Sequence, residues 1–352
     1  MPDLPARPNA QQAQLESLYE EMAPHHLTPL WEVLGDLVLP EPTTPAIPAK
    51  WSYGPMREYL LRAGDLITAA EAERRVLILE NPGMPGDSAI TPRLYAGLQL
   101  VLPGEIAPCH RHSQSALRFI LEGNGAYTAV DGEKAYMHPF DLILTPNWRW
   151  HDHGNPSPDP VIWLDGLDIP TVRALDAQFA ERLGHSQHPE GPAPGTTITR
   201  FGKSLRPLTS GTVRQTLADQ PMFHYPYAEW IEALRALAAS QEPDAYIGHA
   251  MEFRNPVSGD AVMATISAHV RLFPAGFESG IRRSTESAVF TVVSGAGSVE
   301  IDGENFALNP RDVIVVPTWK AARWQAKDEL VLFAFSDRTV QEKLNLYRER
   351  CE

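Results

Sequence analysis

Short runs with hydrophobic side chains at alternate positions dominate the sequence from Leu94 onward. These runs are rich in Val, Ile, Leu, Phe and Tyr and include LYAGLQLVL, SALRFIL, AYTAV, DLILTP and PVIWLDGLD. Gly, Pro, Asn and Asp separate them at intervals of about ten residues. A period of two with regularly spaced turns is typical of antiparallel strands, so the pattern predicts a β-sandwich or a β-barrel.

A different pattern precedes the strands. From about Gln11 to Leu34, apolar and charged residues follow a helical spacing, and the Pro-rich run LPEPTTPAIPAKW then predicts an extended strap. Two further helices are expected, one around residues 56–63 and one beginning at Thr68, where Thr68 and Glu71 have the spacing of a capping box. These elements predict an N-terminal arm that is helical and extended.

The strand pattern occurs twice. The stretch ALRFILEGNGAYTAVDGEKAYMHPFDLILTPNW aligns with AVFTVVSGAGSVEIDGENFALNPRDVIVVPTW, so that Gly125 matches Gly297 and, after the loss of one residue, Pro146 matches Pro317. Two tandem copies of one β-domain are therefore expected. We divide the chain into an N-terminal arm (1–80), a first barrel (81–170), a linker with a helix around 228–240 (171–245), a second barrel (246–340) and a C-terminal tail (341–352).

Composition narrows the class of protein. Of the 352 residues, 43% are hydrophobic and 21% are charged, as in globular proteins, and the 32 Pro and 24 Gly favour turns over long helices. The formal net charge of -14 disfavours nucleic acid and anionic membrane surfaces, so small molecules or other proteins are the expected partners. Two cysteines, Cys109 and Cys351, and the lack of an apolar signal core or membrane-spanning run predict a cytoplasmic protein.

Three histidines carry the candidate chemistry of the first barrel. His110 and His112 are two residues apart, so on a strand their side chains point to the same face. His151, near the end of the same unit, would add a third imidazole from a neighbouring strand. Three imidazoles on one side of a transition metal leave other coordination positions open for ligands.

The spacing of these residues resembles the two sequence motifs of the cupin superfamily. The matching positions are Gly104, His110, His112 and Gly123 for the first motif and Pro146, His151 and Asn155 for the second. The first motif's Glu is missing, because SQSAL offers only Gln114, while Phe140 and Trp148 replace two glycines of the second motif. The resemblance implies a mainly all-β bicupin, with two tandem double-stranded β-helix (jelly-roll) barrels and an N-terminal helical arm.

Among bicupins with three histidines, the chain closely resembles the gentisate 1,2-dioxygenase family. The segments HRHSQSALRFILEGNGAYTAVDG and TPNWRWHDHGN carry the resemblance, which runs from about Tyr19 to Arg338. It implies that His110, His112 and His151 hold one Fe(II) per chain, which opens gentisate with O2 between C1 and C2 to give maleylpyruvate. The family also implies a homo-oligomer, expected to be a tetramer.

Two alternatives remain open at this point. Salicylate or 1-hydroxy-2-naphthoate is a possible substrate, because the same family includes dioxygenases for both acids. A protein of a different class would be a non-catalytic bicupin, but such a protein would be expected to lose its ligand histidines, which this chain retains. A ligand set without a carboxylate leaves the charge of a divalent metal uncompensated, which favours a chelating dianionic ligand, and the resemblance implies that this ligand is a small aromatic hydroxy acid.

Further site residues are expected around the metal. Gln114 and Arg118 share the strand face of the first two histidines, and Arg118 is expected to bind a carboxylate or an oxyanion. His153 shares parity with His151 and is expected to act as an acid or base, aided by Asp165. The plainer alternatives are an ion pair at the barrel mouth for Arg118 and an exposed turn for His153.

Three further expectations complete the first site. Gln99 is expected to orient the substrate, with an ordinary polar strand residue as the alternative. One of Arg74 and Arg75 is expected to reach the substrate carboxylate, with a solvated helix face as the alternative. Trp148 and Trp150 flank the third histidine and are expected to wall the cavity.

The repeat alignment makes a prediction about the second barrel. The three histidines correspond there to Arg282, Ser284 and Ala322, none of which is a workable transition-metal ligand. The second barrel is therefore expected to hold no metal and to serve in packing.

Overall fold

The computed structural model describes residues 8–189, 191–202 and 222–352, which divide into a unit that ends at Thr43 and a unit that begins at Thr44. In the first unit the indole of Trp31 donates a hydrogen bond of 2.7 Å to the Tyr19 hydroxyl, which donates one of 2.6 Å to Glu32. These bonds join its two α-helices. Its elements are α1 (Asn9–Met22), η1 (Ala23–His25) and α2 (Leu30–Leu37).

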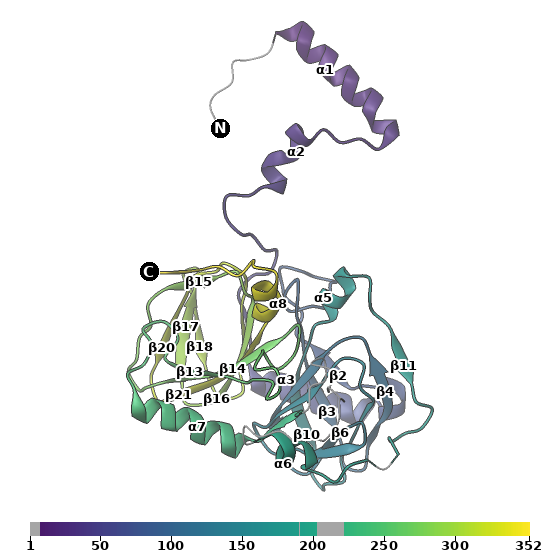
Figure 1. Ribbon diagram of the computed structural model, residues 1–352, viewed down its shortest axis with the longest axis vertical. Coiled ribbons are helices and arrows are strands. Elements are labelled where there is room, and N and C mark those ends of the chain that lie inside the picture. Colours follow the sequence, from purple (N-terminus) through teal and green to yellow (C-terminus); the bar gives the residue numbers. More distant parts are fainter. Residues whose placement is uncertain (1–7, 190, 203–221) are drawn as a thin grey trace, which may run out of the picture. The chain divides into compact units, whose positions relative to one another are not determined.

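Two antiparallel sheets form the first barrel of the second unit (Figure 1). The strand orders are β12-β8-β5-β10-β3-β2 and β11-β4-β9-β6-β7. The strands are β2 (Val76–Ile78), β3 (Tyr95–Val101), β4 (Ile106–His112), β5 (Ala116–Glu122), β6 (Tyr127–Val130), β7 (Glu133–Tyr136), β8 (Leu142–Thr145), β9 (His151–Gly154), β10 (Val161–Leu167), β11 (Ala180–Arg182) and β12 (His224–Tyr225).

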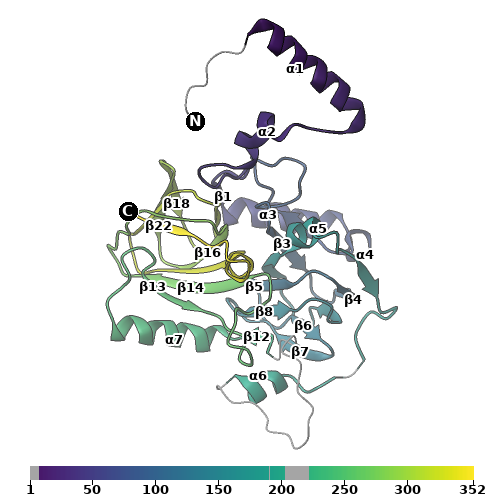
Figure 2. The ribbon, with the colours of Figure 1, turned by 45° about the horizontal axis from the view of Figure 1, so that its top comes forward.

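A second pair of antiparallel sheets forms the other barrel, which lies beside the first in both views (Figures 1 and 2). The orders are β1-β19-β16-β21-β14-β13 and β18-β17-β20-β15-β22. The strands are β1 (Ala49–Trp51), β13 (His249–Glu252), β14 (Ser267–Phe273), β15 (Arg282–Ser284), β16 (Ala288–Ser294), β17 (Gly297–Ile301), β18 (Glu304–Leu308), β19 (Val313–Val316), β20 (Ala322–Ala326), β21 (Leu330–Ser336) and β22 (Glu349–Cys351).

Short helices connect these strands. They are α3 (Tyr53–Leu66), α4 (Ala69–Ala72), α5 (Ile169–Ala174), α6 (Thr196–Phe201), α7 (Tyr227–Ser240) and α8 (Arg338–Lys343). The predicted capping box is present, with the Glu71 N–H donating to the Thr68 hydroxyl and the Thr68 N–H donating to the Glu71 carboxylate. Helix α4 nevertheless ends at Ala72, because Glu73 adopts a positive φ of 52° that no α-helix continues.

Each barrel is completed by a strand from the segment that precedes the other barrel. β1 precedes the first barrel but pairs with β19 of the second, and β12 precedes the second barrel but pairs with β8 of the first. Helix α3 follows β1 and packs on β2 and β3 of the first barrel (Figure 2). Helix α7 follows β12 and packs on β13 and β14 of the second barrel. Two segments of the chain therefore strap the barrels together.

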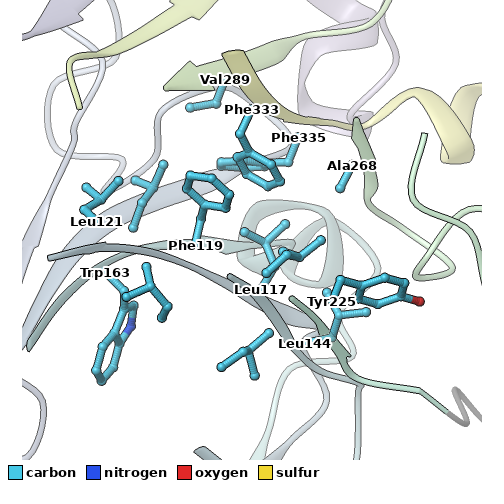
Figure 3. Close-up of a cluster of buried hydrophobic side chains, with 14 of the residues drawn as sticks. Leu117, Phe119, Leu121, Leu144, Trp163, Tyr225, Ala268, Val289, Phe333 and Phe335 are labelled. Atoms are coloured by element: carbon cyan, nitrogen blue, oxygen red, sulfur yellow. The ribbon is translucent and has the colours of Figure 1, made fainter. Parts of the chain in front are cut away.

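Strand β5 separates the interior of the first barrel from the contact between the barrels. Leu117 and Phe119 point toward the second barrel, where the Phe119 ring stacks on that of Phe333 at a centroid distance of 4.0 Å (Figure 3). Gly166 on the neighbouring strand lies against Phe335, and a Cβ at this position would lie 2.8 Å from the ring. Arg118 lies between Leu117 and Phe119 in sequence, so its side chain points to the opposite face, into the first barrel.

The turns of the two barrels share an uncommon backbone conformation. Phe140 and Trp148 have φ values of 69° and 64°, and their repeat partners Arg311 and Trp319 have 69° and 62°. This is the left-handed region, in which glycine is the usual residue. The turns of the motif are thus kept without its glycines, and the Phe140 ring packs 5.4 Å from that of Tyr227.

The structure extends both barrels beyond the strand patterns seen in the sequence. β22 lies in the expected C-terminal tail, where it pairs with β15, and β2 lies in the expected N-terminal arm, where it pairs with β3. The expected linker contains residues 203–221, which lie outside the described residues. Within the described ranges, no helix combines the length and the apolar character needed to cross a membrane.

Candidate metal centre

The three predicted histidines meet inside the first barrel. His110 and His112 lie on β4, and His151 begins β9, where it pairs directly with His110. Their ring centroids lie 4.2 to 5.3 Å apart, and one ring nitrogen of each lies within 4.8 Å of the others. A register shift between Ala107 and His110 interrupts the β4 ladder just before the two ligands. The strand pairing therefore creates a site for one ion from residues about 40 positions apart in sequence.

Backbone carbonyls lie next to the Nδ1 atom of each histidine. The distances are 2.8 Å from His112 to the Gln114 oxygen, 2.9 Å from His151 to the Arg149 oxygen and 3.2 Å from His110 to the Pro108 oxygen. A carbonyl accepts only from a protonated Nδ1, so each contact favours the tautomer whose Nε2 lone pair is free. Such outer hydrogen bonds orient imidazoles for metal binding.

Burial keeps the three rings neutral. Burial, together with the charges of nearby arginines, lowers the pKa of His110 to about 3 and that of His112 to about 4. The pKa of His151 lies well below its usual range, first because the ring is buried and then because the other histidines are near. A neutral imidazole is the form that binds metals, so no proton has to be removed for binding.

The donor set fits a divalent transition metal. His151 Nε2 is buried and has no hydrogen-bond partner among the described residues. An orphaned buried nitrogen is costly unless a ligand satisfies it, and imidazole nitrogens suit iron, zinc, copper or nickel better than calcium or magnesium. Three protein ligands leave further positions on such an ion open.

Arg118 lies at the inner wall of this site with its hydrogen-bonding capacity partly unused. Its Nη1 donates to the Thr145 hydroxyl, and its Nε lies 3.7 Å from Asp165 Oδ1, a distance too long for a hydrogen bond. Nε is buried and has no partner in the described part of the chain. Burial lowers the Arg118 pKa to about 10 against the opposing effect of Asp165, which leaves the guanidinium charged at neutral pH.

Asp165 is held close to the site by its own strand. It pairs in register with Arg118, and the indole N–H of Trp163 donates a 2.8 Å hydrogen bond to its Oδ1. Burial raises the pKa of Asp165 to about 6, while Arg118 acts in the opposite direction. This carboxyl therefore titrates nearer to neutral pH than an exposed aspartate does.

His153 is buried beside the triad, not exposed in a turn. Its ring centroid lies 5.7 Å from that of His151, and its Nδ1 is 2.9 Å from the Thr128 hydroxyl. Its Nε2 is buried without a partner among the described residues. Burial and the nearby Arg118 lower its pKa well below the usual range, so the ring is neutral and can exchange a proton with a bound hydroxyl.

Of the two adjacent arginines, Arg74 reaches the triad. Its Nη2 lies 2.7 Å from His110 Nδ1 and donates a 3.0 Å hydrogen bond to the Pro108 carbonyl. Arg75 instead forms a two-pronged ion pair of 2.9 Å with Glu105 and donates to the Ile67 carbonyl. Arg74 thus borders the site, whereas the contacts of Arg75 fasten β2 to the start of β4.

Arg74 and the Pro108 carbonyl make competing demands on His110. Nδ1 can accept from Arg74 or donate to the carbonyl, but the tautomer that frees Nε2 for a metal carries its proton on Nδ1. In that tautomer two N–H donors would face each other at 2.7 Å, so the Arg74 amino group has to turn away from the ring, which frees one of its donors for an anion in the site.

Gln99 and Gln114 contribute in different ways. Gln99 is buried on β3, next to Trp163 of β10 in register, and its side-chain amide forms no hydrogen bond within the described ranges. The main-chain oxygen of Gln114 accepts the His112 bond, so this residue acts through its backbone.

Three residues near the site were not predicted from the sequence. Thr145 holds Arg118, Thr128 holds His153, and Tyr95 lies on the strand face of Gln99, where burial and the charge of Asp165 raise its pKa. Alternation along β3 indicates Tyr95, whereas the two threonines become visible only from cross-strand pairing.

Trp148 and Trp150, expected to wall the cavity, are joined through Arg111. Both indoles pack against the Arg111 guanidinium, at 4.6 and 4.5 Å from the ring centres, and Arg111 pairs with Glu181. Arg111 lies between His110 and His112, so by strand alternation it points away from the site. Residue spacing alone does not tell which side of a strand a neighbouring loop covers.

In the second barrel the strand pairing agrees with the repeat alignment. Arg282 pairs with Ala322, as His110 pairs with His151 in the first barrel. Arg282, Ser284 and Ala322 offer no imidazole or carboxylate, so this position cannot form the same metal site.

Comparison with known proteins agrees with both the fold and the site. Residues 97–167 match the Cupin domain family. Gentisate 1,2 dioxygenase 1 of Aquipseudomonas alcaligenes is 45% identical over 95% of each chain, and gentisate 1,2-dioxygenase of a Streptomyces species is 35% identical over 95% of this chain and 94% of its own.

A solved structure shows the same architecture. Salicylate 1,2-dioxygenase from Pseudoaminobacter salicylatoxidans, determined as adducts with gentisate, superposes with a TM-score of 0.90 at 34% identity, covering 100% of this chain and 96% of its own. This chain thus shares its fold with the solved relative and is similar in sequence to a gentisate dioxygenase over 95% of its length. It also has the group of His110, His112 and His151, which could hold a metal ion. The chain belongs to the gentisate 1,2-dioxygenase family of ring-cleaving dioxygenases.

Proposed function

We propose that this protein opens the ring of gentisate with O2 between C1 and C2, giving maleylpyruvate, at one Fe(II) per chain held by His110, His112 and His151. The observation that carries the proposal is the convergence of three neutral imidazoles, of which His151 is buried, next to Arg74 and to Arg118, whose Nε has no partner among the described residues. The 45% identity to a gentisate 1,2-dioxygenase over 95% of the chain supports it.

Iron is favoured over other metals because of the reaction. Ferrous iron at this site would supply open positions for chelation of the substrate's carboxylate and adjacent hydroxyl and for activation of O2. The relatives are dioxygenases, and a redox-inactive ion such as Zn²⁺ does not activate O2.

The charges around the site favour an anionic substrate. The ligands carry no charge, Arg118 and Arg74 are cations, and Asp165 is the carboxylate that faces Arg118. We propose that the Arg118 Nε–H and the free donor of Arg74 bind the substrate carboxylate, because a guanidinium can bind a carboxylate with two parallel hydrogen bonds. These contacts would fix the acid with its ring over the triad.

His153 is proposed to hold or move a proton. Thr128 contacts its Nδ1, its ring centroid lies 5.7 Å from that of His151, and its Nε2 has no partner among the described residues. A neutral imidazole there can accept the proton of a substrate hydroxyl as it binds the metal. Gln99, whose amide is unsatisfied among the described residues, would orient the second hydroxyl of gentisate, and the apolar barrel excludes bulk water.

Salicylate is the second candidate substrate. The solved relative at 34% identity is a salicylate 1,2-dioxygenase whose structure contains gentisate adducts, so one site of this fold accommodates both kinds of acid. Salicylate lacks the second hydroxyl, which removes the proposed contact with Gln99. We therefore expect gentisate to be the better substrate of the two.

The deciding experiment is anaerobic reconstitution with Fe(II), followed by exposure to O2 and a panel of gentisate, salicylate and 1-hydroxy-2-naphthoate. We expect O2 uptake with gentisate and a new near-ultraviolet absorption from the ring-opened, conjugated keto acid. A variant with His151→Ala serves as the matched control without the site. No turnover of any acid by iron-loaded protein would refute the proposal, and turnover of salicylate alone would transfer it to the second candidate.

We also propose a homo-oligomer, with a tetramer as the expected form, in the cytoplasm. Helix α2 exposes Leu30, Trp31 and Leu37, a set of large apolar side chains that another subunit could cover. Both cysteines are unpaired, in keeping with a reducing compartment. Light scattering coupled to size exclusion measures the assembly, and a monomer at micromolar concentration would contradict it.

A further inference from the structure

The second barrel contains a buried arginine that pairs with no carboxylate of the described residues. Arg271 on β14 is 5% exposed, and its Nε–H donates a 3.1 Å hydrogen bond to His269 Nε2. Its guanidinium carbon lies 5.0 Å from the centre of the Phe290 ring. Within the described ranges, its two terminal amino groups form neither an ion pair nor a hydrogen bond.

The other cations around it are all paired. Arg282 binds Glu286 at 3.1 Å and Glu349 at 2.9 Å, and separate carboxylates pair with Arg338 and Lys320 at 2.7 and 3.0 Å. Glu286 uses one oxygen for Arg282, while its Oε2 is buried without a partner in the described part of the chain. Unlike Arg282, Arg338 and Lys320, Arg271 therefore has no ion pair within the described ranges to compensate its charge.

The free end of Arg271 borders a cavity of about 340 Å³. His269 lines the same cavity, with Ala250, Met251 and Ile247 as apolar wall and Glu286 as an acidic one. A volume of this size lies at the lower end of the range for small-molecule sites, which starts at about 300 Å³. Since His269 Nε2 accepts from Arg271, the neutral ring carries its proton on Nδ1, which adds a second donor.

An uncompensated guanidinium at this depth is costly. Burial, together with the charge of Arg282, lowers the pKa of Arg271 to about 9, and the group remains protonated at neutral pH. A buried cation is normally paired or hydrogen-bonded, because the protein interior does not replace its hydration. The terminal amino groups of Arg271 therefore require an anion or ordered water in the cavity.

We propose that this cavity of the second barrel is a binding site for a small monocarboxylic acid, whose carboxylate binds Arg271 and His269 and whose apolar body lies against Ala250 and Met251. The Glu286 and Glu252 carboxylates border the same space, which disfavours phosphate and dicarboxylates through like-charge repulsion. This site is separate from the triad and does not depend on the proposed ring-opening reaction.

Equilibrium dialysis with labelled benzoate tests the proposal, on Fe(II)-loaded protein kept anaerobic. Benzoate has the required carboxylate and apolar body but lacks the adjacent hydroxyl needed to chelate the metal. We expect saturable binding that Arg271→Gln weakens by about ten- to a hundredfold, as expected for lost hydrogen bonds to a charged group. The matched variant Arg118→Gln, at the first barrel, should keep this binding.

Four outcomes would overturn the proposal. Three of them are equal affinity in the wild type and Arg271→Gln, loss of all binding in Arg118→Gln, and no saturable binding up to about 10 mM, ten times the dissociation constant of about 1 mM that is typical of a weak ligand. The last result would mean that water alone solvates Arg271. Inorganic phosphate that displaces benzoate at equal concentration would refute the carboxylate class.

A second variant covers the case in which Arg271→Gln does not fold. Glu286→Gln removes the nearest unpaired acidic oxygen and leaves Arg282 its bond to Glu349, so benzoate should bind severalfold more tightly. Unchanged or weaker binding would contradict the site. Circular dichroism and turnover at the first barrel, which both variants should leave unchanged, report whether each protein is folded.

Discussion

The backbone N–H of Tyr53 donates a 3.0 Å hydrogen bond to Asp312 Oδ1, although 259 residues separate the two. Tyr53 is the first residue of α3, so a turn of the second barrel caps a helix that packs on the first. The reciprocal contact exists, because the N–H of Tyr227, the first residue of α7, donates to Asp141 Oδ1 at 2.8 Å. The two barrels thus stabilise each other through equivalent residues of the repeat.

Because Asp312 caps a helix that packs on the first barrel, we expect Asp312→Ala to destabilise the whole second unit. Asp312 also accepts from Lys50 at 3.1 Å and from the Asn309 N–H at 3.2 Å, so the change leaves several donors unsatisfied. We expect a loss of about 2–3 kcal/mol in the free energy of unfolding. Urea denaturation measures it, with the exposed Asp328→Ala as control, and Asp141→Ala should show a similar loss. An unchanged midpoint for Asp312→Ala would contradict the cap.

Replacing any ligand histidine by Ala should remove both iron and activity while the protein stays folded, because the core of the first barrel is apolar and does not include the metal. Metal analysis of the wild type should give about one iron per chain, and His151→Ala should retain close to none. Two irons per chain, with one surviving in His151→Ala, would show that the second barrel binds metal despite Arg282 and Ala322.

Arg118→Lys should already damage catalysis. A lysine can reach Thr145 or a substrate oxygen but cannot replace both the Nη1 and Nε donors of the guanidinium. We expect kcat/KM to fall. The fall should correspond to a loss of about 1.5–3 kcal/mol in transition-state stabilisation, the range for hydrogen bonds to charged groups. Steady-state O2 uptake measures the change, and unchanged kinetics would limit Arg118 to a structural role.

Arg74 and Arg75 form a matched pair for a further test. Arg74→Gln should raise KM for the acid substrate and leave the melting temperature near that of the wild type, since Arg74 has no ion pair as short as those of Arg75. Arg75→Gln should lower the melting temperature, because the buried pair with Glu105 is broken and a carboxylate is left alone. The reverse pattern would exchange the two roles.

The stability of the second barrel should depend on the protonation of Asp337. Burial raises its pKa to about 6, above the value of about 3.9 for an unfolded aspartate. The folded state therefore holds the proton more tightly, so this group stabilises the fold below about pH 4 and loses that contribution as the pH rises through about 6. At pH 7 the charged carboxylate costs roughly 3 kcal/mol relative to its protonated form.

Asp337→Asn should remove this dependence, because an amide keeps the acceptor for the Ser287 N–H at 2.9 Å but does not ionise. The gain in melting temperature over the wild type should be larger at about pH 7.5 than at about pH 4.5. Asp328→Asn, at an exposed site, is the control. A gain that is the same at both pH values would show that the proton of Asp337 does not matter.

Local pattern is enough to predict most strands of the two barrels, the tandem repeat and the shared strand face of His110 and His112, whereas the assignment of His110, His112 and His151 as metal ligands also uses the resemblance. The alternation of polar and apolar residues defines which side chains of a strand share a face, so the spacing of His110 and His112 is sufficient to place them together. The correspondence of Arg282 and Ala322 with His110 and His151 follows from the repeat and agrees with the strand pairing. The substrate class comes from resemblance, not from these patterns.

Only the tertiary structure decided which residues beyond the triad meet. Arg74 and Arg75 are neighbours with the same chemistry, yet one reaches His110 and the other Glu105. The indoles of Trp148 and Trp150 both pack against Arg111, a contact that their spacing from His151 does not indicate. No sequence pattern indicates that β1 pairs with β19 or that Asp312 accepts a hydrogen bond from the Tyr53 N–H. Local periodicity specifies the face of a strand, whereas contacts between distant segments depend on how whole sheets pack, which no local pattern encodes.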